Sequence, residues 1–244
     1  MAALRAADPG SRWFFHRRED GGALVVDVWF HSHDSVLTDT ADRLRGREGG
    51  GSPSTWSFGS PPGVPAGAFS GSPAAEGLTV ALASASSDLA LAALRDGGLP
   101  EDTQRSLALL HLRTLAGLVP DAHRLGFLFL YWESRATELS PGERTRIAQL
   151  ADRHVAEQVS EQSEDIWRGE HEETSWRDYV RATRALVPGD AGAAPPVNYL
   201  LFRHARETHA RLGIPAATEA FAARAVRAAL RAAPAVPVPE LQSA

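Results

Sequence analysis

Between residues 101 and 232 the sequence consists of segments with the apolar spacing of α-helices, separated by prolines and glycines. Both residue types disfavour a helix interior, so Pro120, Pro141, Gly169, Pro188 and Pro215 divide this region. The predicted helices are 101–119, 121–137, 142–160, 176–187, 197–212 and 216–232. A chain with this pattern builds most of its fold by packing helices against one another.

The most hydrophobic stretch, 126–135, lies in the second of these segments. An apolar run from Phe127 to Trp132 stops there at Glu133. Such a short run does not separate a buried strand from the buried part of a helix, but the helical pattern that precedes it favours a helix. A buried Tyr hydroxyl and a buried Trp indole N–H need hydrogen-bond partners. Tyr131 and Trp132 are therefore either satisfied core aromatics or members of a site.

The strongest β signal lies near the N-terminus. Segments 13–18 and 23–32 are rich in aromatic and β-branched residues, and Glu19-Asp20-Gly21-Gly22 separates them. This arrangement predicts two antiparallel strands joined by a tight turn. On the second strand Leu24, Val26, Val28 and Phe30 share one face while Val25, Asp27, Trp29 and His31 share the other, and one of the two faces is predicted to be core.

The region between the hairpin and the helices is mixed. Residues 36–47 have helical spacing, and 49–73 are rich in Gly, Ser and Pro but contain three aromatic residues, which suggest that parts of the segment lie against the domain. The apolar segment 77–83 is predicted to be a third strand. The serines of 84–88 are predicted to cap the helix that follows, since their side-chain oxygens can accept free backbone N–H groups. A nucleophilic serine is less favoured, because the sequence has no G-x-S-x-G motif.

These elements predict an α+β fold, with a small antiparallel β-sheet at the N-terminus and a larger C-terminal helical layer. We expect a single domain over residues 1–244, which is long enough to bury a core. Its β-rich part is 1–95, its helical part is 99–232, and 233–244 is a proline-rich tail that is expected to be disordered.

The residue types that are missing limit the chemistry. The chain has no Cys, and all 25 basic residues are Arg. This excludes thiol nucleophiles, thiolate metal sites, disulfides, Schiff bases and phosphate-loop lysines. His31, His33 and Asp34 follow one another closely, but no third ligand stands at a defined spacing and the polar end of a strand explains them equally well, so no metal is expected.

Charge and hydrophobicity indicate where the chain works. A net charge of -5 gives no basic surface for nucleic acid. No apolar run approaches the roughly 20 residues needed to span a bilayer, and the first residues lack a hydrophobic signal core. A cytoplasmic location is therefore expected, without membrane or nucleic-acid partners.

Four segments point to one family. They are Trp13-Phe14-Phe15-His16-Arg17, Trp56-Ser57-Phe58, Ser86-Ser87-Asp88-Leu89-Ala90-Leu91, and 198–214 with its closing Ala210-Arg211-Leu212-Gly213-Ile214. In this order they resemble the thiopeptide-type bacteriocin biosynthesis family, which is similar to the C-terminal elimination domain of lantibiotic dehydratases. The resemblance spans nearly the whole chain through short motifs.

That resemblance implies one of two chemistries. Eliminating members remove glutamate from glutamylated Ser or Thr of a precursor peptide, and pyridine-forming members join two dehydroalanines in a formal [4+2] cyclisation, then lose water and the leader peptide.

Eliminating members carry His-Leu-Arg-Leu-Arg-Phe on the second strand, where paired arginines would bind the glutamyl carboxylate. Aligning on Phe30-His31 places Asp27 and Trp29 at those positions. The usual His-Met-His-x-Asn-Arg-Leu-Gly is also altered, to the sequence from Arg206 to Gly213. Both departures favour the pyridine-forming branch.

The resemblance thus implies a lyase- or cyclase-type enzyme that forms the central pyridine or dehydropiperidine ring. This chemistry needs orientation and a proton shuttle, and no cofactor. By residue type and location, the catalytic candidates are Tyr131, Tyr199 and His204, and the substrate-binding candidates are Trp132, Asn198, Arg203 and Trp29. Alternatively, Asn198 caps a helix and Arg203 forms a surface pair with Glu207.

The expected partner is a modified precursor peptide with its leader and core, and a homodimer is left open. Two other functions remain open at this point. One is glutamate elimination from a glutamylated peptide, and the other is a non-catalytic module that binds the leader peptide.

Overall fold

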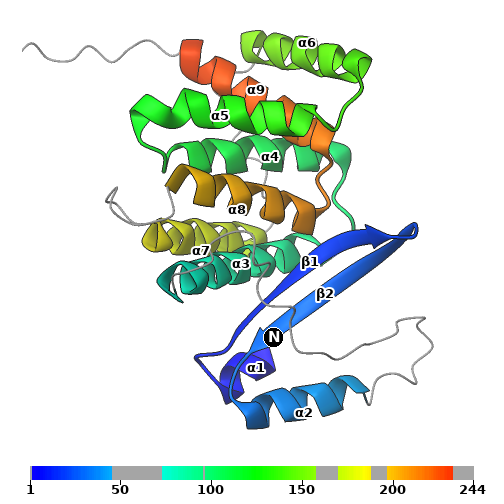
Figure 1. The fold of residues 1–244 in the computed structure, drawn as a ribbon, viewed down its shortest axis with the longest axis vertical. Helices are drawn as coiled ribbons and strands as arrows, with labels where there is room; N and C mark the ends of the chain where they lie inside the picture. The colour runs from blue at the N-terminus through cyan, green and yellow to red at the C-terminus, as the bar shows by residue number, and fades with distance from the viewer. Residues whose placement is uncertain (1, 46–72, 96, 158–169, 188–196, 233–244) are drawn as a thin grey trace, which may run out of the picture. The chain divides into compact units, whose positions relative to one another are not determined.

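The structure is a computed structural model, which describes residues 2–45, 73–95, 97–157, 170–187 and 197–232 (Figure 1). The chain divides into two compact units: unit 1 is Met1–Gly98 with Gly169–Gly213, and unit 2 is Leu99–Arg168 with Ile214–Ala244. This division differs from the one expected from sequence. Residues 169–213 belong with the N-terminal strands, not with the remaining helices.

Unit 1 contains a two-stranded antiparallel hairpin, β1 (Arg12–Asp20) and β2 (Ala23–His31). It confirms the predicted strand pair and, with the mostly helical remainder of the described residues, the α+β fold class. Gly21 and Gly22 form the turn with φ of 58° and 82°. A two-residue turn of this kind requires positive φ at both central positions, and glycine adopts it without steric cost.

The helices of unit 1 are α1 (Ala2–Ala7), α2 (Asp34–Arg45), α3 (Pro73–Ala93), α7 (Glu170–Leu186) and α8 (Val197–Leu212). Of these, α1 and α2 contact each other, and α3 packs against β1, α7 and α8 (Figure 1). The hairpin therefore joins the helices mainly through α3, with a smaller contact to α8.

The predicted strand 77–83 is wrong, because these residues form the first part of α3. Ala and Leu have high helix propensity, and the contacts of α3 with three neighbouring elements bury an apolar run just as a sheet would. The predicted serine cap is wrong for the same reason. Ser84, Ser86 and Ser87 lie inside the helix and are buried, and the Ser86 hydroxyl donates to the Ala83 carbonyl at 3.2 Å.

The face of β2 that carries Leu24, Val26, Val28 and Phe30 is only partly buried. Trp13 and Phe15 of β1, which share this face, are buried, but Leu24 and Val26 are 58% and 48% exposed. The hydrogen bonds that join the hairpin to α3 and α8 start from Trp13, Phe15 and Arg17, so the far half of the hairpin projects beyond them. A strand pattern alone does not reveal how much of a two-stranded sheet its neighbours cover.

Unit 2 is formed by α4 (Glu101–Ala116), α5 (Asp121–Ala136), α6 (Pro141–Glu157) and α9 (Ala216–Ala232). These four predicted helices are confirmed to within a few residues. Helix α9 packs against the other three (Figure 1). Its alanines at 220, 222, 223 and 225 are buried, and such small side chains let neighbouring helices approach closely.

The core of unit 2 contains a buried polar group that links α5 to α9. The Tyr131 hydroxyl donates to Glu219 Oε2, and Arg135 Nε lies 3.2 Å from Glu219 Oε1. Arg135 also pairs with Glu138 at the end of α5. The side chains of Tyr131, Arg135 and Glu219 are all buried, and the Tyr131–Glu219 hydrogen bond replaces bonds that these two groups would make with water. Arg135 Nε lies within ion-pair distance of Glu219 but forms no hydrogen bond there.

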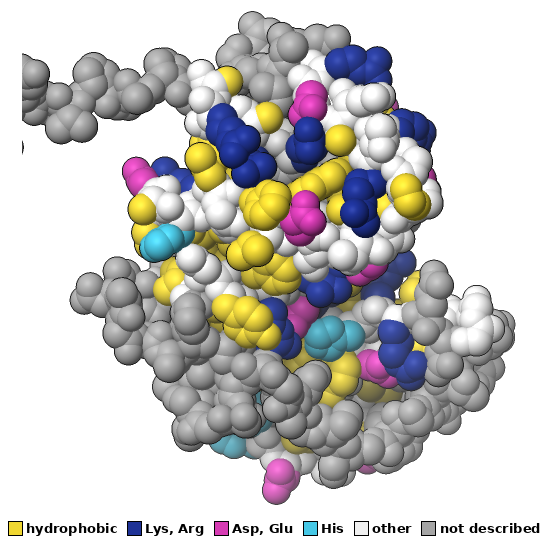
Figure 2. Space-filling model, turned by 45° about the horizontal axis from the view of Figure 1, so that its top comes forward, with side chains coloured by type: hydrophobic (Ala, Val, Ile, Leu, Met, Phe, Trp, Pro, Cys, Tyr) yellow, Lys and Arg dark blue, Asp and Glu magenta, His cyan; other side chains and the backbone are white. Residues whose placement is uncertain are grey.

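Arginines also pack over aromatic rings in unit 2. Arg224 lies 5.4 Å above the ring of Trp132 and binds Asp152 through two hydrogen bonds of 3.0 and 2.9 Å, which join α9 to α5 and α6. Arg227 lies 4.7 Å above Phe129. On the face drawn in Figure 2, arginine side chains accordingly lie among hydrophobic ones.

Some sequence predictions fall outside the described residues. These are the Gly/Ser/Pro-rich segment up to residue 72, with Trp56, Phe58 and Phe69, and the tail 233–244. Among the described helices, none combines the length and the hydrophobicity that crossing a membrane requires.

Candidate functional site

Arg211, on α8, is the largest fully buried side chain among the described residues. Its guanidinium reaches three elements: Nε donates to the Phe15 carbonyl at 2.6 Å, Nη1 to Ser86 Oγ at 2.9 Å, and Nη2 to Glu207 Oε2 at 3.4 Å. A buried cation is tolerated only when such bonds compensate for its lost hydration. Arg211 thus fixes β1, α3 and α8 relative to one another.

The start of β1 is also bound to α3 by side chains. The Phe15 backbone N–H donates to Ser87 Oγ at 3.1 Å, and Trp13 Nε1 donates to Asp88 Oδ1 at 3.1 Å. The serines that the sequence suggested as a helix cap therefore anchor the strand. Their partners lie more than 70 residues away in the sequence, which is why local patterns did not indicate them.

The end of α8 completes this arrangement. Arg17 Nη1 donates to the Arg211 carbonyl at 3.2 Å, and Gly213 follows with φ +72°. The positive φ favours glycine at this position, and a Cβ there, 2.6 Å from Arg17 Nη1, would also require the Arg17 guanidinium to shift. Three of the four segments that carry the family resemblance meet here, and the fourth, with Trp56, lies outside the described residues.

Next to Arg211 the cluster opens toward solvent. Glu207 Oε1 lies 3.2 Å from Arg203 Nη2, and the side chains of Arg203 and Glu207 are each 24% exposed. The partly buried His16 completes a group that we call the β1–α8 cluster: His16, Arg203, Glu207 and Arg211. Burial, and then the positive charge of Arg211, lower the pKa of His16, while Glu207 and Asp27 oppose the shift. The imidazole is therefore neutral at neutral pH and can both accept and donate a proton.

Aromatic rings border this cluster. Phe14 and Trp29 stack with ring centroids 5.1 Å apart, and the His16 ring meets Trp29 edge-on at 5.0 Å. Asp27 pairs with Arg18 at 2.9 Å. This face of the hairpin thus carries the stacked Phe14 and Trp29 rings, with His16 edge-on to Trp29, next to the Arg18–Asp27 pair.

A small hollow lies between α3 and α8 at the same place. Leu82, Arg203, His204 and Glu207 are among the residues that line it, and its volume is about 10 Å³. This is about the room that one water needs. Any larger molecule has to bind on the half-exposed surface of the cluster.

His204, a predicted catalytic residue, belongs to the interior of unit 1. It is 4% exposed, and its Nε2 lies 2.7 Å from the Tyr179 hydroxyl of α7. Burial, followed by the charges of Arg211 and His209, lowers the pKa of His204 to about 3, and burial raises the pKa of Tyr179. Both side chains are neutral at neutral pH and hydrogen-bond each other. This arrangement indicates a packing role.

The buried His204 makes the stability of the protein depend on pH. In the unfolded chain this imidazole takes up a proton below its ordinary pKa of 6.5, while in the folded chain it stays neutral down to about 3. The free energy of unfolding should therefore fall as the pH drops through 6.5, by at most about 1.4 kcal/mol per pH unit from this group. We expect H204Q to flatten this slope in urea titrations at pH 7 and pH 5, and an unchanged slope would contradict the assignment.

The other predicted residues divide between the units. Tyr131 and Trp132 lie in unit 2, are 0% and 6% exposed, and are satisfied core aromatics, the first of the two interpretations offered by the sequence. In unit 1, Tyr199 is 46% exposed and Asn198 is half-buried in the first turn of α8. Only Arg203, with Trp29 nearby on the hairpin, belongs to the half-exposed cluster.

Sequence reasoning missed His16, Glu207 and Arg211 as a group. His16 and Arg211 stand inside the motifs that carry the resemblance, but their proximity depends on a contact between residues 196 positions apart. Among the described side chains, no group of three or more His, Asp or Glu residues is arranged to hold a metal ion.

Comparison with known proteins adds no relative to this picture. No protein-family model, no curated protein and no solved structure matches the chain.

Proposed function

We propose that this chain is a thiopeptide biosynthesis enzyme that joins two dehydroalanines of a precursor peptide in a formal [4+2] cyclisation, followed by loss of water and the leader peptide. The product is the central six-membered nitrogen ring. The single observation that carries the proposal is that the motifs of the resemblance from β1, α3 and α8 meet around Arg211. Separate motifs that converge in space are more informative than the same motifs in a linear sequence.

The β1–α8 cluster offers groups that suit this chemistry. One substrate amide must pass its N–H proton to its own carbonyl oxygen to become the azadiene that reacts with the second dehydroalanine. A neutral His16 can accept a proton at one ring nitrogen and return another from the second. The half-exposed Arg203 can donate to a peptide carbonyl, and Glu207 can accept from a peptide N–H.

The aromatic pair on the hairpin suits the positioning that cyclisation demands. Holding two reacting groups in register can lower the barrier by about 7 to 11 kcal/mol in well-oriented systems. Phe14 and Trp29 provide aromatic contacts for azole rings or dehydroalanines next to His16. Because Trp29 stacks and Asp27 pairs with Arg18, neither holds a glutamyl carboxylate, which favours cyclisation over elimination.

The proposal is tested with two synthetic peptides and mass spectrometry. A precursor with azoles and two dehydroalanines is expected to lose water and release its leader as the ring forms. Glutamate loss from a glutamylated peptide, without ring formation from the other peptide, would contradict cyclisation and support elimination instead. Binding of either peptide without any mass change would contradict both reactions and support a non-catalytic module that binds the leader peptide.

If His16 moves the proton, H16F should lower the cyclisation rate by about 100-fold or more, because general acid–base groups typically contribute 10²–10⁴. Phenylalanine retains a ring against Trp29, so packing is largely preserved. The measurement is the initial rate as the pH is lowered from neutral: the wild-type rate should fall as His16 becomes protonated, below its ordinary pKa of 6.5, and this fall should be absent in H16F. R206A, at an exposed position on α8, is the control and should retain the wild-type rate. An H16F enzyme with the wild-type rate and pH profile would refute this role.

A further inference from the structure

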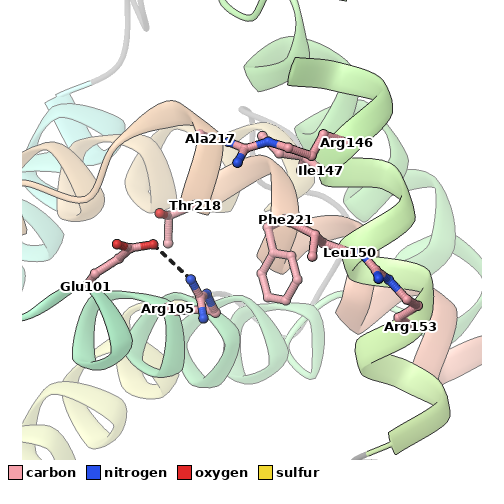
Figure 3. Close-up of a pocket in the computed structure, with 9 residues that line it drawn as sticks. All are labelled: Glu101, Arg105, Arg146, Ile147, Leu150, Arg153, Ala217, Thr218 and Phe221. Carbon is pink, nitrogen blue, oxygen red and sulfur yellow. Dashed lines mark hydrogen bonds and ion pairs between the residues drawn. The ribbon is translucent and has the colours of Figure 1, made fainter. Parts of the chain in front are cut away.

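Unit 2 has a second cavity that the proposed function does not use. It lies between α4, α6 and α9, whose lining side chains Figure 3 draws, and it has a volume of about 420 Å³. This volume falls within the range of about 300 to 1,000 Å³ that is typical of small-molecule sites. All its lining residues belong to unit 2.

The side chains that line the cavity carry more positive than negative charge. Arg105, Arg146 and Arg153 line it, against the single carboxylate of Glu101. Arg105 is already paired, with Nη2 2.9 Å from Glu101 Oε1 and Nη1 3.4 Å from Asp102 Oδ1. Neither Arg146 nor Arg153 forms an ion pair with any residue that the structure describes. These two guanidinium groups leave the cavity with an excess of positive charge.

Its floor is apolar. Phe221 and Ile147 are 8% and 4% exposed, and Leu150 beside them is 39% exposed. The Arg105 guanidinium lies 5.6 Å from the centre of the Phe221 ring. In Figure 3 the Phe221 ring and the Leu150 side chain lie between Arg105 on one side and Arg153 on the other. A ligand in this cavity would thus meet a hydrophobic surface and, at its edges, forked donors.

We infer that this cavity binds a small molecule that carries an oxyanion, a carboxylate or a phosphate, on a flat apolar body. Arginine's planar fork matches carboxylate and phosphate oxygens in bidentate geometry, and Phe221 with Ile147 covers the apolar part. This inference does not depend on peptide cyclisation, because the site shares no residue with the β1–α8 cluster.

The test is isothermal titration of the full chain with four probes: phenyl phosphate, phenylacetate, inorganic phosphate and benzyl alcohol. Saturable binding is expected for phenyl phosphate or phenylacetate, and the stronger of the two identifies the preferred oxyanion. Inorganic phosphate and benzyl alcohol each lack one half of the recognised group and should bind at least about tenfold more weakly. Equal binding of either half-probe, or no saturation by the two complete probes up to about 10 mM, would overturn the inference.

Variants place the binding in the cavity. R146Q/R153Q should weaken binding of the stronger complete probe by about tenfold or more, since it removes the charge-assisted hydrogen bonds to the oxyanion. L150D, at a half-exposed lining position, should also weaken the binding of this probe, because the introduced carboxylate repels the oxyanion. The control is R181Q, which changes the net charge at an exposed position on α7 in unit 1. If R181Q weakens binding as much as L150D does, the ligand is attracted by net charge alone and the inference fails.

Discussion

R211A is expected to lower the free energy of unfolding by about 3 to 5 kcal/mol, the usual cost of removing one member of a buried ionic pair. The substitution leaves the Phe15 carbonyl without its donor and Glu207 without one of its two arginines, and opens a space where the most voluminous buried side chain stood. Because this guanidinium bonds to both β1 and α3, we expect the hairpin contacts to be lost first.

Urea denaturation followed by far-UV circular dichroism and by tryptophan fluorescence measures this effect. R211K should fall between R211A and wild type, since an ammonium group can satisfy one of the partners but not three elements at once. R206A, five residues earlier on an exposed part of α8, should change stability by no more than about 0.5 kcal/mol. Comparable stability of R211A and R206A would show that Arg211 does not hold unit 1 together.

E219A is expected to lower the free energy of unfolding by about 3 kcal/mol through unit 2. The Glu219 carboxylate accepts from the Tyr131 hydroxyl and lies 3.2 Å from Arg135 Nε, and all three side chains are buried. Its removal takes this acceptor away from two side chains that lie inside the core. The expected loss lies at the lower end for buried ionic groups, because Arg135 keeps Glu138.

Matched variants separate charge from packing at this position. Y131F removes only the hydroxyl and should cost about 1 to 3 kcal/mol, the penalty for a buried acceptor that loses a donor. E133A, at an exposed position on α5, should be nearly neutral. A Glu219 variant that unfolds at the same urea concentration as E133A would mean that this buried group does not contribute to stability.

The sequence predicted the helices well because their boundaries are chemically marked. The predicted bounds of α8 and α9 match the structure at both ends, and the intervening Gly213 and Pro215 explain why. The segment 77–83 was mistaken for a strand because a short apolar run has the same composition in a buried helix, and only its neighbours distinguish the two.

The candidate site was predicted less well, because its geometry depends on distant contacts. The Arg211 to Phe15 bond spans 196 positions and the Tyr131 to Glu219 bond spans 88. The four-residue spacing along α8 predicted the Arg203–Glu207 pair, but it could not predict that His16 of β1 lies beside that pair. It also could not tell that Tyr131 and His204 point inward, since an amphipathic aromatic residue suits a core and a site equally.

The two bonds at Phe15 have a further consequence for how the protein behaves at high concentration. Both outward-facing backbone groups of this residue are already occupied, the N–H by Ser87 and the carbonyl by Arg211. An additional strand could not pair at this point on β1 without displacing a helix side chain. Unprotected sheet edges are where native proteins begin to aggregate. At Phe15, side chains of α3 and α8 thus cover the edge of β1 and prevent another molecule from pairing with the hairpin there.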